Sequence, residues 1–274
     1  MNLIKKSKKV FNIPIFADSV QENVYFYTFF VKSIEMNNTP PVTKNLIIIN
    51  VLCFFGAIVA EKYGINLNDA LGLHYFESEK FRLYQLITYM FMHSGFEHIF
   101  FNMFAVWMFG RILETVWGSQ RFLFYYVLCG IGAGLVQEVT QYFEFIPYMA
   151  DMAQLSAYAP EAIVPINGVS HTASQWLAMY ERVISVPTVG ASGAVYAILM
   201  AFGMMFPNQE IFIFPLPMPI KAKWLIIGYF VIELSMGIMS NDGIAHFAHL
   251  GGMIFGFLLI MYWRKKGGGY GRYY

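Results

Sequence analysis

The sequence has few charged residues and almost no cysteine. Aspartate, glutamate, lysine and arginine make up only 13% of its 274 residues, whereas an ordinary soluble domain carries about 25%. The two cysteines, Cys53 and Cys129, both lie in apolar runs, where they behave as small hydrophobic residues and support neither a disulfide framework nor a metal cluster. No glycine-rich loop precedes a lysine in a phosphate-binding pattern, so nucleotide and nucleic-acid binding have no support.

Hydrophobic residues are abundant instead. They make up 57% of the chain, aromatic residues make up 18%, and the mean hydropathy is +0.50. Because a bilayer-spanning helix needs about 20 apolar residues, the pattern predicts a polytopic, all-α membrane protein with six spans. These lie at roughly 43–60, 92–110, 121–140, 189–206, 222–239 and 244–263.

Six spans place both termini on one side of the membrane, and the basic residues indicate which side. On the side of the termini the sequence is rich in lysine and arginine, including Lys5, Lys6, Lys44, Arg111, Arg121, Lys223, Arg264 and Lys265. The opposite side holds only Lys62, Lys80, Arg82 and Arg182. Since cytoplasmic flanks retain positive charge, both termini are expected in the cytoplasm, and the expected location is a bacterial inner membrane.

The chain divides into three parts. Residues 1–41 are expected to form a cytoplasmic extension, residues 42–263 the six-helix membrane domain, and residues 264–274 a cytoplasmic tail. Within the membrane domain, the amphipathic stretch Phe76–Tyr84 predicts an interfacial loop after the first helix. The long segment 141–188 predicts an outer-side insertion between the third and fourth helices.

Strongly polar residues gather at the start of the second, fourth and sixth spans. This topology makes all three spans enter from the outer face, so their first residues share one depth. His98 and Asn102 lie one helical turn apart on the second span, and His249 shares a helix face with Gly252 on the sixth. Polar side chains at membrane depth are costly and indicate a functional site.

Ser192 lies between small residues at the start of the fourth span. One interpretation is purely structural, because Gly193, Ala197 and Ala201 recur every four residues and form a packing face. The nucleophile elbow of soluble hydrolases does not fit, since Ala194 stands where its second glycine would be.

Two kinds of chemistry could use the polar cluster. A metal site could take nitrogen ligands from His93, His98, His246 and His249. Zinc sites usually add cysteine or carboxylate, however, and the H-E-x-x-H arrangement is absent, so no metal and no cofactor is expected.

The alternative is nucleophilic catalysis. Ser192 would attack, His249 would take its proton, and His98, Asn102 and the Ser192 backbone N–H would donate hydrogen bonds to the oxyanion. His246 is expected one turn nearer the surface, in a wetter place that suits only a polar lining. No spacing ties Glu233 of the fifth span to a histidine, so a Ser-His dyad is the predicted unit.

These residues together resemble the rhomboid intramembrane serine proteases over residues 42–263. The resemblance rests on four motifs: Phe81-Arg82, His93 with His98-x-x-x-Asn102, Gly190-Ala-Ser192-Gly193, and Ala248-His249-Leu-Gly-Gly252. It implies the same dyad and oxyanion site, with Tyr196 packed against His249 and His93 as a structural polar residue. Phe81 replaces the tryptophan usual in the family, and the 141–188 insertion is not part of the minimal pattern.

The sequence thus predicts an intramembrane serine endopeptidase that cleaves transmembrane segments of single-span proteins within the lipid bilayer. The alternative is a non-catalytic protein of the same fold that binds such clients, which would be expected to lack Ser192 or His249. A transporter is a weaker alternative, because it would carry polar residues along its full depth.

Overall fold

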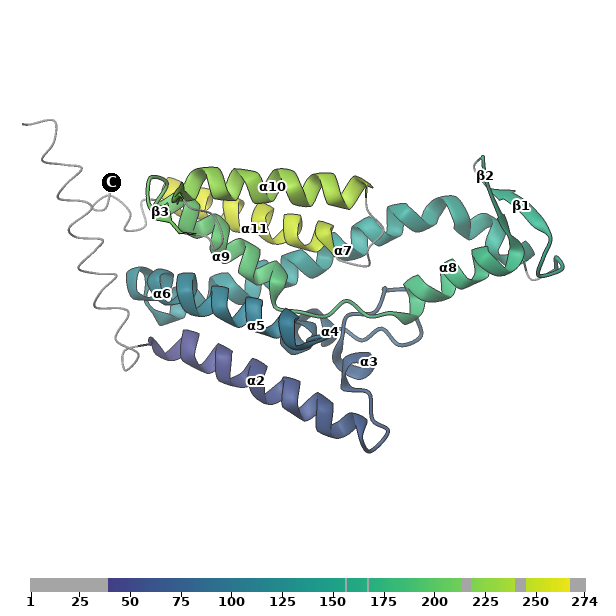
Figure 1. Cartoon of the computed structure of the whole chain (residues 1–274), viewed down its shortest axis with the longest axis horizontal. Helices are drawn as coiled ribbons and strands as arrows, with labels where there is room; N and C mark the ends of the chain where they lie inside the picture. The colour runs from purple at the N-terminus through teal and green to yellow at the C-terminus, as the bar shows by residue number, and fades with distance from the viewer. Residues whose placement is uncertain (1–38, 156, 167, 213–217, 240–244, 267–274) are drawn as a thin grey trace, which may run out of the picture.

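A computed structural model describes residues 39–155, 157–166, 168–212, 218–239 and 245–266 (Figure 1). The expected extension 1–41 and tail 264–274 therefore lie almost entirely outside the described residues. The helices are α2 (Pro41–Glu61), α3 (Leu67–Leu71), α4 (Gln85–Thr88), η2 (Tyr89–Phe91), α5 (Phe96–Ala105), η3 (Val106–Gly110), α6 (Arg111–Trp117), α7 (Ser119–Leu155), α8 (Ala173–Ser185), α9 (Ser192–Met205), α10 (Ala222–Met239) and α11 (His246–Lys265). Two short hairpins, absent from the all-α prediction, pair β1 (Ile163–Ile166) with β2 (Val169–Thr172) and β3 (Glu210–Ile211) with β4 (Ile220–Lys221).

Among the described residues, five helical segments are long and apolar enough to cross a membrane. They are Pro41–Glu61, Phe96–Trp117, Ser119–Phe143, Ala222–Met239 and His246–Lys265. All five overlap predicted spans, although the second begins at Phe96 rather than at 92 and ends at Trp117 rather than at 110. The second consists of α5, η3 and α6 in series, because a π-helical turn at Val106–Gly110 joins the two α-helices.

The predicted fourth span differs, because α9 is only 14 residues long. It begins at Ser192 rather than at 189, since Gly190 has a φ of 130° and the chain before it is not helical. A short helix is sufficient here because α9 lies inside the protein and contacts α5, α7, α10 and α11. Ala197, Ala201 and Gly193 are all buried, which confirms the packing face predicted from their spacing.

Close contact between α9 and α11 depends on glycine. A Cβ at Gly252 would lie 1.9 Å from the carbonyl oxygen of Gly193, and a Cβ at Gly256 would lie 3.2 Å from the Cβ of Ala197. No side chain fits in the first of these gaps. The two helix backbones therefore meet directly, as small residues allow in membrane helix pairs.

Helix α2 lies at the edge of the bundle (Figure 1) and is held by a buried carboxylate. Glu114 of α6 accepts hydrogen bonds from the backbone N–H groups of Val42 at 2.9 Å and Thr43 at 2.7 Å. It also accepts from the hydroxyls of Thr43 and Ser119, both at 2.7 Å. An acidic group at a helix N-terminus satisfies unpaired N–H groups and complements the helix dipole, so Glu114 fixes where α2 begins.

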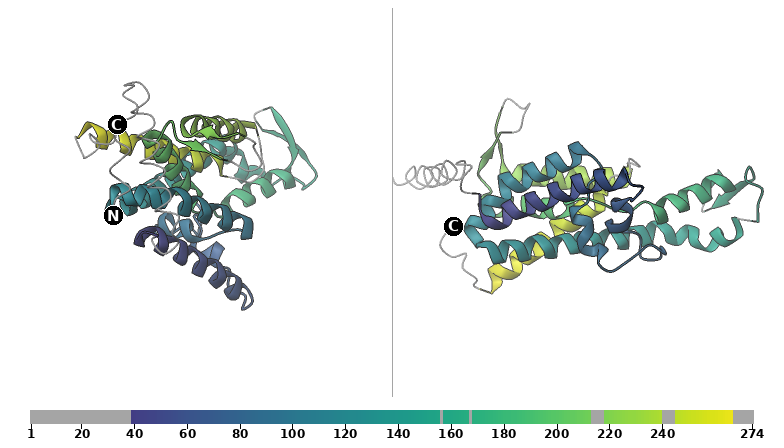
Figure 2. Two further views of the ribbon diagram at one scale, coloured as in Figure 1. Left: turned by 60° about the vertical axis from the view of Figure 1, so that its left-hand side comes forward. Right: turned by 90° about the horizontal axis from the view of Figure 1, so that it is seen from below.

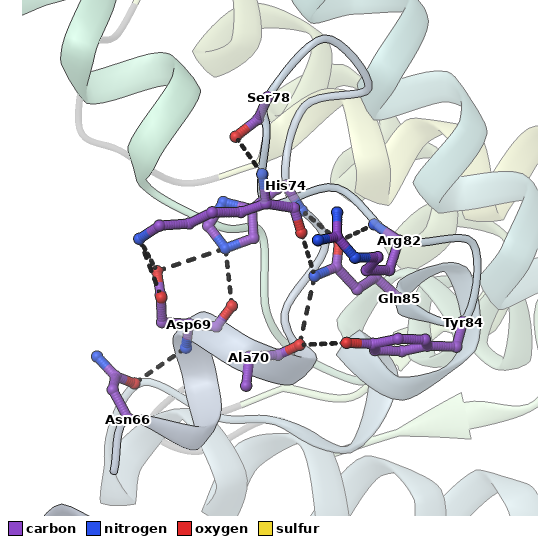
Figure 3. Close-up of polar contacts among 9 residues, drawn as sticks. Asn66, Asp69, Ala70, His74, Ser78, Arg82, Tyr84 and Gln85 are labelled. Carbon is purple, nitrogen blue, oxygen red and sulfur yellow. Dashed lines mark hydrogen bonds and ion pairs between the residues drawn. The ribbon is translucent and has the colours of Figure 1, made fainter. Parts of the chain in front are cut away.

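The loop between α2 and α5 is held together by side chain to backbone hydrogen bonds (Figure 3). The buried Gln85 donates to the carbonyl of Lys80 at 3.0 Å and accepts from the backbone N–H of Arg82 at 3.0 Å. Lys80 forms an ion pair with Asp69 at 2.8 Å, and the buried ring of His74 contacts the Asp69 carbonyl at 2.8 Å. The predicted interfacial loop is thus an ordered structure.

The segment 141–188, predicted to be an insertion, begins within α7, which continues to Leu155. Beyond the membrane-length part of α7, the chain forms an arm made of β1, β2 and α8, which projects from the bundle (Figures 1 and 2). The arm has its own small core around Trp176, whose indole N–H donates to the Val164 carbonyl at 2.9 Å. The other buried members of this core are Leu155, Val164, Ile166 and Ala173.

The start of α2 and the end of α11 lie at the same end of the bundle, and the loop and the arm lie toward the other end (Figure 1). The described part of the chain thus enters and leaves the bundle at one end, and the side of the membrane on which the termini lie stays a prediction. Lys44, Arg121 and Arg264 belong to the first turn of α2, the first turn of α7 and the last turn of α11.

Candidate active site

The turn before Ser192 is pinned to the loop that precedes α5. Thr188 and Leu73 exchange two backbone hydrogen bonds of 2.8 and 2.9 Å, and the Gly190 N–H donates to the Tyr89 carbonyl at 2.9 Å. Gly190 then takes a φ of 130°, which L-residues rarely adopt. These contacts place Ser192 at the first position of α9.

His249 lies on the first turn of α11 and reaches Ser192. Its Nε2 is 2.9 Å from the Ser192 hydroxyl oxygen. The ring of Tyr196, one turn along α9, stacks on the imidazole with centroids 4.4 Å apart and an interplanar angle of 12°. The structure thus brings Ser192, His249 and Tyr196 together, and their role in catalysis stays a prediction.

His98 and Asn102 lie one turn apart on α5, and His98 faces the space beside Ser192. A Cβ at Gly190 would lie 2.6 Å from His98 Nε2 and 3.6 Å from the Ser192 hydroxyl oxygen, so the glycine keeps the space between the two side chains open. The other ring nitrogen of His98 contacts the Ser94 hydroxyl at 3.0 Å. Asn102 is 5% exposed, and its Nδ2 has no hydrogen-bond partner among the described residues.

Glu233 of α10 is a site residue that the sequence prediction missed. Its Oε2 lies 2.9 Å from Nδ1 of His249 and 2.7 Å from Nδ1 of His246. Its Oε1 accepts a hydrogen bond from the Tyr196 hydroxyl. The expectation that no acidic residue meets His249 is therefore wrong. The position of Glu233 inside an apolar helix could have indicated this role, because a carboxylate at membrane depth needs a polar partner.

His246 also differs from its prediction. It is 7% exposed and His249 is 9% exposed, so it is no wetter than the histidine beside Ser192. Its Nδ1 binds Glu233 and not Ser192. The prediction that His246 is not the group facing the serine agrees with this geometry, but the physical reason is its carboxylate partner and not exposure to water.

Two further predicted residues, Arg82 and His93, belong to the stretch of chain before α5. The Arg82 guanidinium donates to the carbonyls of Glu79 at 2.8 Å and Phe81 at 2.7 Å, which folds the loop onto itself. His93 is buried just before α5, with its ring 5.0 Å from that of His98. Burial, together with the neighbouring His98, lowers the pKa of His93 to about 4, so this ring is neutral near pH 7.

Glu233, His246 and His249 could also supply ligand atoms to a metal ion, because one such atom from each lies within 4.8 Å of the others. Both histidine nitrogens lie at hydrogen-bond distance from one carboxylate oxygen, and each bond needs a proton between the two atoms. This set differs from the four histidines that the sequence offered as possible ligands, since His93 and His98 are not part of it.

With this geometry established, the comparison with known proteins identifies the family. A model of the rhomboid domain matches residues 80–266, which include His98, Ser192, Glu233 and His249. The chain belongs to the rhomboid family. It is a mostly helical, multi-pass membrane protein of that family, as the resemblance of its motifs predicted.

Several curated rhomboid proteins are similar to the chain. It is 28% identical over 182 residues to mitochondrial Rhomboid protein 1 of Saccharomyces cerevisiae, covering 66% of this chain and 42% of that protein. It is 28% identical over 184 residues to Rhomboid protease GluP of Bacillus subtilis, covering 65% and 33%. Chloroplastic Rhomboid-like protein 11 of Arabidopsis thaliana is 24% identical over 228 residues, covering 72% and 61%.

The chain therefore spans between 33% and 61% of the length of these rhomboid relatives. They come from mitochondria, a bacterium and a chloroplast, so they support a multi-pass membrane location but not the predicted bacterial inner membrane. Two of the bacterial relatives, GluP and AarA of Providencia stuartii, are named as rhomboid proteases.

Proposed function

We propose that this rhomboid protein is an intramembrane serine endopeptidase that cleaves transmembrane segments of single-span proteins. One observation carries the proposal: His249 Nε2 lies 2.9 Å from the Ser192 hydroxyl oxygen. This is the distance over which a general base takes the proton of a serine nucleophile. A protein that only binds clients has no need for this contact, and the protease names of its relatives favour catalysis.

The proposed reaction begins with Ser192. Its oxygen attacks the carbonyl carbon of the scissile peptide bond while its proton passes to His249 Nε2. Nε2 then returns the proton to the leaving amine nitrogen, and the chain is left as an acyl-enzyme on Ser192. Water attacks this ester while His249 Nε2 takes its proton. Nε2 then passes that proton to the Ser192 oxygen as the acyl C–O bond breaks, which releases the carboxylate product and restores the serine.

Negative charge develops on the carbonyl oxygen during the attack. We assign the donors that stabilise it to His98, Asn102 and the backbone N–H of Ser192. Two observations support them: the unpartnered and buried Nδ2 of Asn102, and the open space that Gly190 leaves beside His98 Nε2. Donors aimed at such an oxyanion act strongly where water is excluded.

The architecture proposed with this function is a six-helix membrane domain over 42–263 with both termini in the cytoplasm. Five helical segments among the described residues are long enough to span, and we assign the shorter apolar helix α9 as the sixth. In this arrangement Ser192 lies below the membrane surface, and the loop and the arm lie on the outer side. Clients would reach the site laterally from the lipid, and no metal or cofactor takes part.

The test is cleavage of a tagged single-span protein by the purified chain in proteoliposomes. Wild-type protein is expected to release two fragments, and Ser192→Ala is expected to release none while unfolding at the same temperature. Cleavage by the Ser192→Ala protein at the wild-type rate would overturn the proposal.

A further inference from the structure

Glu233 is the one acidic residue on α10, a helix whose other side chains are mostly apolar. It is 6% exposed, and both of its carboxylate oxygens bind polar groups. Oε1 accepts from Tyr196, and Oε2 contacts Nδ1 of His246 and of His249. A carboxylate at membrane depth is costly, and every one of these partners belongs to the site around Ser192.

We propose that Glu233 is a positioning residue that completes a Ser192–His249–Glu233 triad in place of the dyad read from the sequence. This inference rests on the proposed protease function and deepens it. Glu233 does not touch the substrate, and it acts through His249.

The geometry gives Glu233 a definite role. Nδ1 of His249 lies 2.9 Å from Oε2 of Glu233, and Nε2 of His249 lies 2.9 Å from the Ser192 hydroxyl oxygen. A carboxylate only accepts hydrogen bonds when ionised, so Nδ1 must carry the hydrogen and Nε2 must present its lone pair to the serine. Glu233 thereby selects the tautomer in which His249 can take the serine proton.

The same carboxylate stabilises the charge that forms next. When the Ser192 proton passes to Nε2, the imidazole becomes a cation with Nδ1–H directed at Glu233. Glu233 remains ionised throughout, so no proton moves onto it. In a site shielded from water this attraction is stronger than it would be at a surface.

Tyr196 and His246 hold the carboxylate in place. The Tyr196 hydroxyl donates a hydrogen bond to Oε1 of Glu233, and the Tyr196 ring stacks on His249. One side chain therefore orients both Glu233 and His249. His246 shares Oε2 with His249. Because three donors from two other helices surround Glu233, its position is fixed before a substrate arrives.

The first experiment compares Glu233→Gln with wild type in the proteoliposome assay, measuring kcat and KM separately. Glutamine keeps the shape but offers an N–H₂ in place of one acceptor. We expect kcat to fall about 10²- to 10⁴-fold with KM nearly unchanged. Labelling of Ser192 by a fluorophosphonate should slow in parallel, and Glu233→Asp should recover part of both rates.

Glu114→Gln is the matched control, because it makes the same change at another buried carboxylate that accepts several hydrogen bonds. It should lower the unfolding temperature but leave kcat and Ser192 labelling as in wild type. A merely structural Glu233 would behave as Glu114 does. Equal kcat in Glu233→Gln and wild type would overturn the proposal, whereas absence of both cleavage and labelling in wild type would overturn the protease function itself.

A second measurement uses wild-type protein, so it does not depend on whether a Glu233 variant folds. In wild-type protein labelled with ¹⁵N-histidine, the His249 resonance, assigned by its loss in His249→Gln, should show hydrogen on Nδ1 and not on Nε2. The opposite tautomer contradicts the triad. Loss of activity with a chelator and its return with Zn²⁺ would also overturn it and would assign Glu233, His246 and His249 to a metal.

Discussion

Polar atoms around Ser192 are paired with one another inside an apolar bundle. His249 uses both ring nitrogens and Glu233 uses both oxygens. Two nearby groups are exceptions among the described residues: both ring nitrogens of His93 and the Nδ2 of Asn102 are buried with no hydrogen-bond partner. The Asn102 Nδ2 is the one that can only donate. An unpaired buried donor costs about 1–3 kcal/mol. We therefore interpret it as a group that gains its partner only when the oxyanion forms.

This interpretation predicts the effect of Asn102→Ala. Removing a donor used only in the transition state should lower kcat about 10²- to 10³-fold and leave KM nearly unchanged. Asn50→Ala is the control, since Asn50 is also a buried membrane asparagine, and its Nδ2 donates to the Leu46 carbonyl at 2.8 Å within α2. Steady-state measurement of kcat and KM for the two variants checks this prediction. A rise in KM with constant kcat in Asn102→Ala would indicate ground-state binding instead.

The contact between α9 and α11 brings Ser192 and His249 together. Ser192 begins one helix and His249 lies in the first turn of the other, so their separation depends on how closely the two backbones approach. Gly252 faces the carbonyl of Gly193 with no room for a side chain. The glycines therefore control the distance between Ser192 and His249.

Gly252→Ala should accordingly destabilise the protein and slow cleavage. Its Cβ would lie 1.9 Å from the Gly193 oxygen, and overpacking of this kind costs about 1–3 kcal/mol or more. Gly228→Ala on α10 is the control, because its Cβ would meet nothing within 4 Å. Thermal unfolding in detergent should show a lower midpoint for Gly252→Ala only; equal midpoints would refute the close contact.

The sequence was sufficient to predict this contact but not the one made by Glu233. Gly252 and His249 share a face through spacing within one helix, and that spacing is visible in the residues themselves. Glu233 reaches His249 from another helix, and the rotation of α10 about its axis decides whether they meet. Because α10 is apolar on every side, its sequence has no periodicity that sets this rotation.

Some helix boundaries were likewise predictable from the sequence, and others were not. The lengths of the apolar runs predicted five spans closely, since the hydrocarbon thickness fixes helix length. The start of α9 was misplaced, because the backbone hydrogen bonds that hold residues 188–190 to the loop come from residues far away in the sequence. The continuation of α7 to Leu155 was also missed, because it forms where α7 meets the core of the arm.

At the scale of the whole molecule, the fold separates a membrane bundle from the projecting arm. Each has its own buried core, and the chain passes from α8 of the arm directly into the turn that carries Ser192. The residues to which we assign catalysis and positioning lie within the bundle, on α5, α9, α10 and α11. We propose that these helices form a single proteolytic unit, in which Ser192 and His249 act together on a transmembrane substrate.

That claim is tested most directly by a double-mutant comparison in proteoliposomes. The cleavage rates of Ser192→Ala, His249→Ala and the double variant are measured with one single-span substrate, with His246→Ala beside them. When two groups act as a unit, removing the second after the first causes no further loss of rate. We predict the same near-complete loss in all three, with measurable activity left in His246→Ala. Additive losses, or abolition by His246→Ala with survival of His249→Ala, would contradict the account.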